Sequence, residues 1–163
     1  MITILGTFQT RLSIAYPQHN PGECPDGWVQ FRHFCYKSFT DEVSWRDAQS
    51  VCESEGSNLA SVETEEEGKF IASISGPNTW LGGTDLDTEG QWKWVDNARW
   101  TWNAIGWGAP NGEPNGKTSE NCLVTWGSGE EWNDATCNPG WWATKFVCEK
   151  IDSNGYLVVP FLG

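Results

Sequence analysis

The two short segments Glu113-Pro114-Asn115 and Trp132-Asn133-Asp134 decide how the rest of this sequence is interpreted. Cys122 lies between them, and Cys137 follows the second. Together with one acid ahead of Cys122, they supply five side chains that end in oxygen: Glu113, Asn115, Glu120, Asn133 and Asp134. Calcium prefers about 6–8 oxygen ligands, and these side chains with one backbone carbonyl supply about six. The remaining positions suit outside oxygens, such as two neighbouring hydroxyls of a sugar. The alternative is a polar surface loop whose acids are only solvated.

The composition indicates a single acidic domain with structural cysteines. Its 163 residues fall within the ~100–200 residues of one domain. The six cysteines form no C-x-x-C pair, which favours disulfides in an oxidising compartment over zinc or dithiol chemistry. A net charge of −12 repels phosphate backbones, so nucleic-acid binding is not expected. No apolar run reaches ~18 residues, so we expect no membrane span. Residues 1–18 lack the basic start of a signal peptide.

Apolar periodicity predicts two helices among short strands. One helix is expected from the N-cap Ser44 to Gly56, and a second from Thr64, which opens a capping box with Glu67, to Gly76. Strands are expected at residues 29–38, 80–82, 91–95, 122–126 and 145–149. Residues 97–120 form a long loop rich in Gly, Asn, Pro and Trp, and compact domains seldom keep such a loop without a function.

The ends of the chain lie outside this pattern. Residues 1–23 alternate weakly and end in turn residues, so we interpret them as an N-terminal extension. Residues 151–163 form a C-terminal extension, in which residues 156–159 are apolar enough for an added strand.

Residues 24–150 resemble a C-type lectin domain of the long form in order, spacing and cysteine positions. The residues that carry the resemblance are Cys24, Cys35, Tyr36, Trp45-Arg46-Asp47-Ala48, Cys52, Leu59-Ala60-Ser61-Val62, Trp80-Leu81-Gly82, Trp92, Trp94, Glu113-Pro114-Asn115, Cys122, Trp132-Asn133-Asp134, Cys137 and Phe146-Val147-Cys148-Glu149. The resemblance implies an α+β fold in which two helices flank small antiparallel sheets beside a long calcium-binding loop region. It also implies three disulfides, which pair Cys24 with Cys35, Cys52 with Cys148, and Cys122 with Cys137.

The resemblance further implies that the five oxygen-bearing residues bind calcium. Asp134 would contribute both its carboxylate and its backbone carbonyl, and the Glu113–Pro114 bond would be cis. A Glu-Pro-Asn sequence accompanies mannose, fucose, N-acetylglucosamine and glucose in that family, whereas Gln-Pro-Asp accompanies galactose. We therefore predict binding of the mannose type. Indoles crowd this part of the chain, and Trp107 and Trp126 are the best candidates for sugar contact. An indole near the ion would favour galactose instead.

A second calcium site often accompanies the first in that family. The matching positions are Asp85, Glu89, Gly116 and Asn121, with Glu120 shared between the sites. Glycine offers no ligand and Asn121 replaces an acid, so we expect this site to be weak or absent. The alternative for Asp85 and Glu89 is that they are ordinary turn acids.

Three functional readings follow from these residues. The first is a calcium-dependent sugar-binding module that acts on glycans of cell or microbial surfaces, outside the cell, with oligomers adding avidity. The second is a glycosidase with Glu113 and Glu120 as its carboxylate pair. It is disfavoured because calcium ligands serve poorly as general acids, and His19 and His33 lie far from them in sequence. The third is a protein-binding or ice-binding relative on the same fold.

Overall fold

The computed structural model describes residues 24–101, 106–108, 112–140 and 142–152. The N-terminal extension and residues 153–163 lie outside the described residues, including the strand expected at 156–159. Ile151, placed at the start of the C-terminal extension, belongs instead to the last strand. The described elements are β1 (Val29–Phe31), β2 (Phe34–Phe39), α1 (Trp45–Ser54), β3 (Asn58–Leu59), α2 (Glu65–Ser75), β4 (Thr79–Thr84), β5 (Lys93–Trp94), the 3-10 helix η1 (Lys117–Ser119), β6 (Cys122–Trp126), β7 (Glu131–Ala135) and β8 (Lys145–Ile151). None of the described helices is long and apolar enough to cross a membrane.

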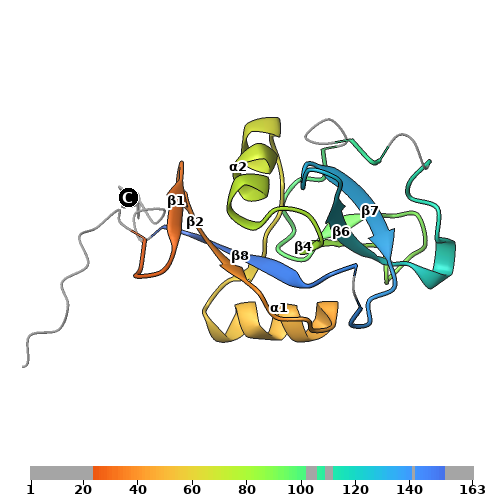
Figure 1. The fold of residues 1–163 in the computed structure, drawn as a ribbon, viewed down its shortest axis with the longest axis horizontal. Coiled ribbons are helices and arrows are strands. Elements are labelled where there is room, and N and C mark those ends of the chain that lie inside the picture. The colour runs from red at the N-terminus through yellow and green to blue at the C-terminus, as the bar shows by residue number, and fades with distance from the viewer. Residues whose placement is uncertain (1–23, 102–105, 109–111, 141, 153–163) are drawn as a thin grey trace, which may run out of the picture.

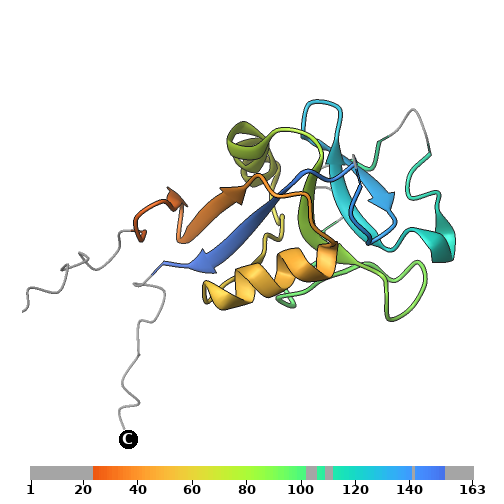
Figure 2. The same ribbon diagram turned by 60° about the horizontal axis from the view of Figure 1, so that its bottom comes forward.

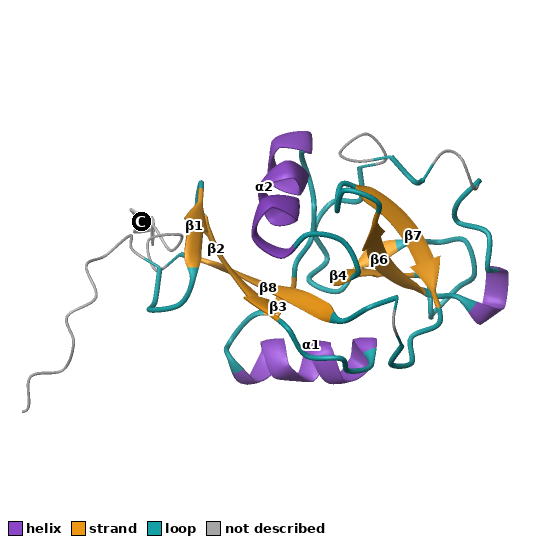
Figure 3. Cartoon of the chain, in the orientation of Figure 1, coloured by secondary structure: helices purple, strands orange, loops and turns teal. Residues whose placement is uncertain are grey.

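The strands join into one mixed sheet (Figure 3). Its order is β1-β2-β8-β4-β6-β7, with β3 added to β8 and β5 added to β4. The fold class is confirmed, but the expectation of purely antiparallel sheets is wrong at one pairing. β4 and β8 run parallel, through Thr79 opposite Lys145 and Trp80 opposite Phe146. Apolar alternation marks which residues form strands, and it carries no information on which distant strand becomes the neighbour.

Both helices begin where their capping residues predict. The Ser44 hydroxyl accepts a hydrogen bond from the backbone N–H of Asp47, and the Thr64 hydroxyl accepts one from Glu67. The capping box around Thr64 is modified, however. The Glu67 carboxylate turns inward and accepts from the N–H of Glu63 at 2.7 Å and from the Tyr36 hydroxyl. This carboxylate therefore links α2 to β2 in addition to closing the first turn of the helix.

Residues 29–38, where alternation predicts strands, form two strands that pair as a hairpin. Arg32 lies in the turn between β1 and β2 with a φ of 54°. The alternation of apolar residues shifts by one position at the turn, because Arg32 and His33 separate Phe31 from Phe34. Cys24 and Cys35 brace this hairpin with a disulfide.

The core lies on both sides of the sheet. Figures 1 and 2 show α1 and α2 on opposite sides of β2 and β8. One buried cluster includes Trp45, Ala48 and Cys52 of α1, and the other includes Ile71 of α2 together with several indoles. At position 82 the backbone of β4 passes so close to β3 that a Cβ would lie 2.6 Å from the Leu59 carbonyl oxygen. Only glycine fits this crossing.

All three expected disulfides are present. Cys24 pairs with Cys35, Cys52 with Cys148, and Cys122 with Cys137. The second joins α1 to β8 across a sequence separation of 96 residues. The third joins the start of β6 to the turn after β7, so it braces the strand pair that carries Asn133 and Asp134.

Candidate functional site

The segments 113–115 and 132–134 meet at Asp134. This residue lies on β7 and is only 1% exposed. One oxygen of its carboxylate accepts from the backbone N–H of Asn115 at 3.0 Å, and the other accepts from the N–H of Gly116 at 2.8 Å. The end of the long loop is thereby fixed to β7, at the end of the molecule remote from the β1–β2 hairpin (Figure 1).

A second part of the loop is fixed to the same strand. The N–H of Gly108 donates to the Trp132 carbonyl at 2.9 Å, and the N–H of Trp132 donates to the Gly106 carbonyl at 3.4 Å. Trp107 and Trp132 thus form an isolated parallel bridge. The chain around residues 106–108 and the chain around residues 115–116 are therefore both held by backbone groups of β7 or by the Asp134 carboxylate.

Glu113 lies between these two attachments in an electrostatically unfavourable position. The Glu113–Pro114 peptide is cis, as the resemblance implied. One Glu113 oxygen, Oε2, is buried without a hydrogen-bond partner. Burial raises the pKa of Glu113 to about 7, with further contributions from a hydrogen bond to Asp134 and from the charges of Asp134 and Glu120. A buried oxygen without a partner, beside two further carboxylates, suits a cation.

Glu120 and Asn133 lie beside Asp134, but both make contacts within the protein. Burial and the charge of Asp134 raise the pKa of Glu120 as well. The Glu120 side chain approaches Gly116 so closely that a Cβ at position 116 would overlap it. The Asn133 amide donates to the backbone carbonyl of Asp134 at 2.6 Å, so these two candidate groups are hydrogen-bonded to each other.

These internal contacts occupy several of the candidate ligand atoms. Within the residues that the structure describes, no three histidine, cysteine or acidic side chains lie in an arrangement that could hold a metal ion. Like charges repel, and Asp134 and Asn133 satisfy neighbouring backbone groups instead. The donor types fit calcium, which prefers carboxylate and amide oxygens. Side-chain rotations of Glu120 and Asn133 would then be needed to bring them together.

The two indoles chosen for sugar contact lie in different surroundings. Trp107 packs among core indoles, with its ring centre 4.8 Å from that of Trp92 and 6.0 Å from that of Trp132. Trp126 instead lines a cleft of about 210 Å³ at the site. The other residues that line this cleft are Glu120, Asn133, Asp134, Ala135, Thr136 and Trp142. Sequence reasoning missed Trp142, because nothing in the run of tryptophans shows which one turns toward the site.

The positions matched to a second ion are only partly assembled. Asp85 is buried, and its Oδ2 accepts from the N–H of Gly90 at 2.8 Å. Its Oδ1 is buried without a partner. Glu89 is exposed, and the Asn121 amide donates to the Thr118 carbonyl at 3.2 Å.

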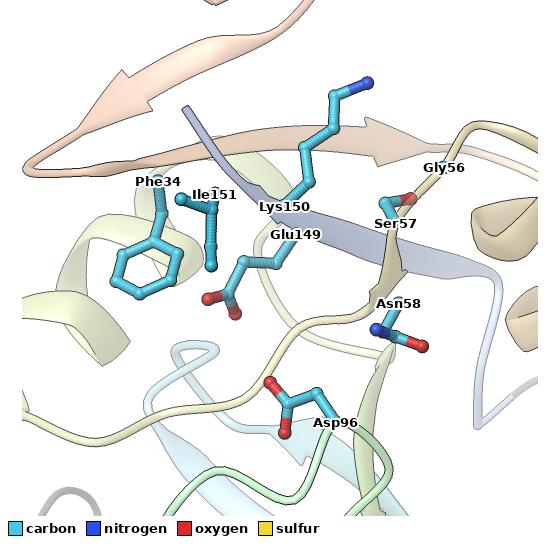
Figure 4. A pocket seen from close by; sticks show the side chains of 8 residues that line it. All are labelled: Phe34, Gly56, Ser57, Asn58, Asp96, Glu149, Lys150 and Ile151. Carbon is cyan, nitrogen blue, oxygen red and sulfur yellow. The ribbon is translucent and has the colours of Figure 1, made fainter. Parts of the chain in front are cut away.

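A larger hollow of about 440 Å³ lies elsewhere, beside β8. Figure 4 shows the carboxylates of Glu149 and Asp96 projecting into it from different segments, with Lys150 pointing away. Glu149 is 7% exposed, and its Oε2 accepts from the N–H of Ser61 at 2.9 Å. Burial raises the pKa of Glu149 well above its ordinary value, and the nearby charges of Glu67 and Asp96 raise it further.

Replacing Glu149 with glutamine is expected to stabilise the metal-free protein near neutral pH. Glutamine keeps an oxygen that can accept from the N–H of Ser61. Its amide NH2 group is uncharged, so the repulsion with Glu67 and Asp96 is lost. The folded state holds the Glu149 proton to a higher pH than the unfolded state does. The free energy of unfolding of the wild type therefore falls as the pH rises above the ordinary pKa of a glutamate. The expected gain is on the order of 1 kcal/mol, or about 2–4 °C in Tm.

Thermal denaturation at pH 5 and pH 8 checks this expectation, in EDTA so that calcium bound elsewhere does not change Tm. The gain should be larger at pH 8 than at pH 5. Glu42→Gln, at an exposed acid, is the control and should leave Tm unchanged. A lower Tm for Glu149→Gln at pH 8 would contradict the assignment of repulsion.

Comparison with known proteins identifies the family and supports the fold. The family described as "Lectin C-type domain" matches residues 41–150. The galactose-specific lectin nattectin of Thalassophryne nattereri is 34% identical over 134 residues, which cover 78% of this chain and 80% of nattectin. The CD209 antigen of Homo sapiens is 33% identical over 136 residues, which cover 78% of this chain. The match spans only 31% of CD209, so the chain corresponds to about a third of that relative's length.

Solved structures agree with the sequence relatives. The carbohydrate-recognition domain of cow CD23, determined in the presence of a GlcNAc2Man3 oligosaccharide, has a TM-score of 0.71 and 32% identity. That comparison covers 80% of this chain and 97% of the CD23 domain. A calcium-independent type II antifreeze protein has a TM-score of 0.72 and 26% identity, covering 83% of this chain and 99% of the antifreeze protein. With the family match over residues 41–150, these findings lead to one conclusion: the chain belongs to the C-type lectin domain family.

Proposed function

We propose that this domain binds sugars through a calcium ion held by Glu113, Asn115, Glu120, Asn133 and Asp134. C-type lectins generally depend on calcium and include carbohydrate-binding relatives. The observation that carries the proposal is the state of Glu113. Its Oε2 is buried without a hydrogen-bond partner, and its pKa is raised first by burial and then by two neighbouring carboxylates. A divalent cation would satisfy that oxygen and remove the repulsion.

The chain's own groups would then orient a sugar. Bound calcium would supply coordination positions for two neighbouring hydroxyls. The second oxygens of Glu113 and Glu120 accept hydroxyl protons, because an ionised carboxylate only accepts. The amides of Asn115 and Asn133 donate to the hydroxyl oxygens. Acceptors and donors therefore alternate around the sugar, and this arrangement selects the geometry of the diol.

We propose mannose-type sugars as the ligands, with fucose, N-acetylglucosamine and glucose in the same class. The Glu-Pro-Asn order supports this choice, as does the mannose-containing oligosaccharide named for the CD23 structure. Galactose is the competing sugar, because nattectin is galactose-specific by name and Trp126 offers a stacking face. Elution of bound protein by free mannose rather than free galactose would decide between them.

Retention on a mannose resin tests the proposal. Wild-type protein should be retained in calcium and released by EDTA. Asn115→Asp should reduce retention strongly, because it replaces a donor amide with an acceptor. Asn138→Asp makes the same change at an exposed position outside the ligand set and should be retained like wild type. Retention that persists in EDTA would count against the proposal.

Calcium affinity is expected to fall as the pH drops below about 7. Glu113 has its pKa raised to about 7 in the metal-free protein, so below that pH calcium must displace a proton. Each further pH unit then lowers the apparent affinity about tenfold. Calorimetric titration with calcium between pH 8 and pH 5 measures this. An affinity that stays constant over the range would contradict the expected proton displacement.

Ice binding is the second candidate, because the antifreeze structure is a close match in fold. That neighbour is calcium-independent by its description. Thermal hysteresis of the purified domain, measured in EDTA, tests this candidate. Ice shaping without calcium, together with no calcium-dependent hit on a glycan array, would favour ice binding over sugar binding.

The wider setting of the domain follows from the same residues. C-type lectin domains are in general not enzymes, so we do not propose a glycosidase role for Glu113 and Glu120. The three disulfides support an extracellular, secreted location. We propose glycans of cell or microbial surfaces as partners, and homo-oligomers as the source of avidity.

A further inference from the structure

We propose that Trp126 and Trp142 form a second sugar subsite, which holds the ring linked to the calcium-bound one. The inference rests on the proposed sugar-binding function and specifies its ligand as an oligosaccharide. Both indoles are half-buried and line the 210 Å³ cleft. This volume is below the ~300–1,000 Å³ of clefts that hold drug-sized ligands, and it suits one ring.

Strand geometry directs Trp126 into the cleft. Trp126 pairs with Glu131, and Val124 pairs with Asn133, across β6 and β7. Directly opposed residues of an antiparallel pair point to the same face. Trp126 and Asn133 therefore share one face of this strand pair, whereas Trp132 and Asp134 point to the other. The Trp126 indole and the proposed ion ligand Asn133 are therefore diagonal neighbours on one face of the strand pair.

The turn before β8 supplies Trp142, which also lines the cleft. The N–H of Ala143 donates to the Gly140 carbonyl at 3.0 Å, which closes a turn around Trp142. A Cβ at position 140 would overlap the Trp142 ring, so glycine allows the indole to lie against the backbone there. Part of Trp142 packs on the core cluster that includes Val124 and Ala135. The indole is therefore held in place while it lines the cleft.

The cleft is continuous with the proposed ion site. Glu120, Asn133 and Asp134 line it, and the same three residues are proposed calcium ligands. A sugar held at the ion would extend into the cleft that both indoles line. A pyranose ring has faces of C–H groups, which suit the negative faces of aromatic rings. The Thr136 hydroxyl, which also lines the cleft, can donate to or accept from a ring hydroxyl.

Calorimetry with wild type and variants tests the subsite. The probes are methyl α-mannoside and the α1,2-, α1,3- and α1,6-linked mannobioses, all in calcium. Wild type should bind at least one mannobiose more tightly than the monosaccharide. Trp142→Ala should weaken that mannobiose about 3- to 10-fold more than it weakens the monosaccharide. Trp142→Phe, which keeps an aromatic face, should retain most of the preference and shows that the turn still folds.

Each other outcome overturns the inference in a recognisable way. An unchanged mannobiose preference in Trp142→Ala would show that the indole does not contact the second ring. Equal weakening of monosaccharide and mannobiose in both Trp142 variants would assign Trp142 to the fold or to the first ring. Failure of wild type to bind any of these sugars in calcium would reject the proposed mannose-type specificity, and the subsite with it.

Discussion

Replacing Asp134 with asparagine is expected to lower calcium affinity by at least about 100-fold. Loss of an outer-shell partner typically costs ~10–100-fold, and Asp134 is proposed as a direct ligand. The substitution also removes a structural acceptor. The two carboxylate oxygens of Asp134 each accept a backbone N–H, from Asn115 and from Gly116. Asparagine has one oxygen, so one of these N–H donors would face the amide NH2 group, which is itself a donor.

The loss of that hydrogen bond should also be visible without calcium. A buried donor left unpaired costs about 1–3 kcal/mol, so the metal-free variant should melt several degrees lower. Calcium titration by calorimetry and thermal denaturation in EDTA measure the two effects separately.

Glu131→Gln is the matched control for Asp134→Asn. It removes one negative charge from the same strand at an exposed position. Both its calcium affinity and its Tm in EDTA should match those of wild type within error. If the two variants lost calcium affinity equally, the effect would come from net charge, and Asp134 would lose its assignment as a ligand.

Removing the Cys52–Cys148 disulfide is expected to destabilise the fold more than any other single change to the cross-links. The two residues are separated by 96 positions, and both are fully buried. In the chain-entropy account, opening a loop of that length lowers the free energy of unfolding by about 4–5 kcal/mol. For a domain of this size the corresponding fall in Tm is roughly 10–20 °C. The double variant Cys52→Ala, Cys148→Ala avoids free thiols in this comparison.

The N-terminal hairpin provides the matched control. Cys24 and Cys35 are separated by only 11 positions, so their removal should cost about 3 kcal/mol in the same account. Urea denaturation of both double variants measures the difference. If loss of the hairpin disulfide destabilised the protein as much as loss of Cys52–Cys148, loop length would not explain the role of the central disulfide.

Local signals in the sequence predict much of the fold. Ser44 and Thr64 accept hydrogen bonds as N-caps because capping depends on residues within one turn. The β6 strand spans Cys122–Trp126 as expected, because its apolar run is short and bounded. The resemblance supplied the three disulfide pairs, which spacing alone left open among 15 connectivities.

Features that depend on residues far apart in the chain could not be predicted from the sequence. The parallel pairing of β4 with β8 joins segments that are far apart in the chain. The Glu67 carboxylate was expected to act within its own helix, and it also accepts from Tyr36 on β2. Trp142 becomes a cleft residue only because a turn at Gly140 places its ring beside β6 and β7. In each case the deciding contact comes from another part of the fold.

A crystal structure of the domain with calcium and methyl α-mannoside tests the central claim most directly. The account predicts one ion bound by Glu113, Asn115, Glu120, Asn133 and Asp134, with the Asn133 amide turned away from the Asp134 carbonyl. Two neighbouring hydroxyls of the sugar should complete the coordination of that ion. A fully calcium-loaded crystal in which Glu120 and Asn133 keep their present contacts, with no ion between them, would contradict the account.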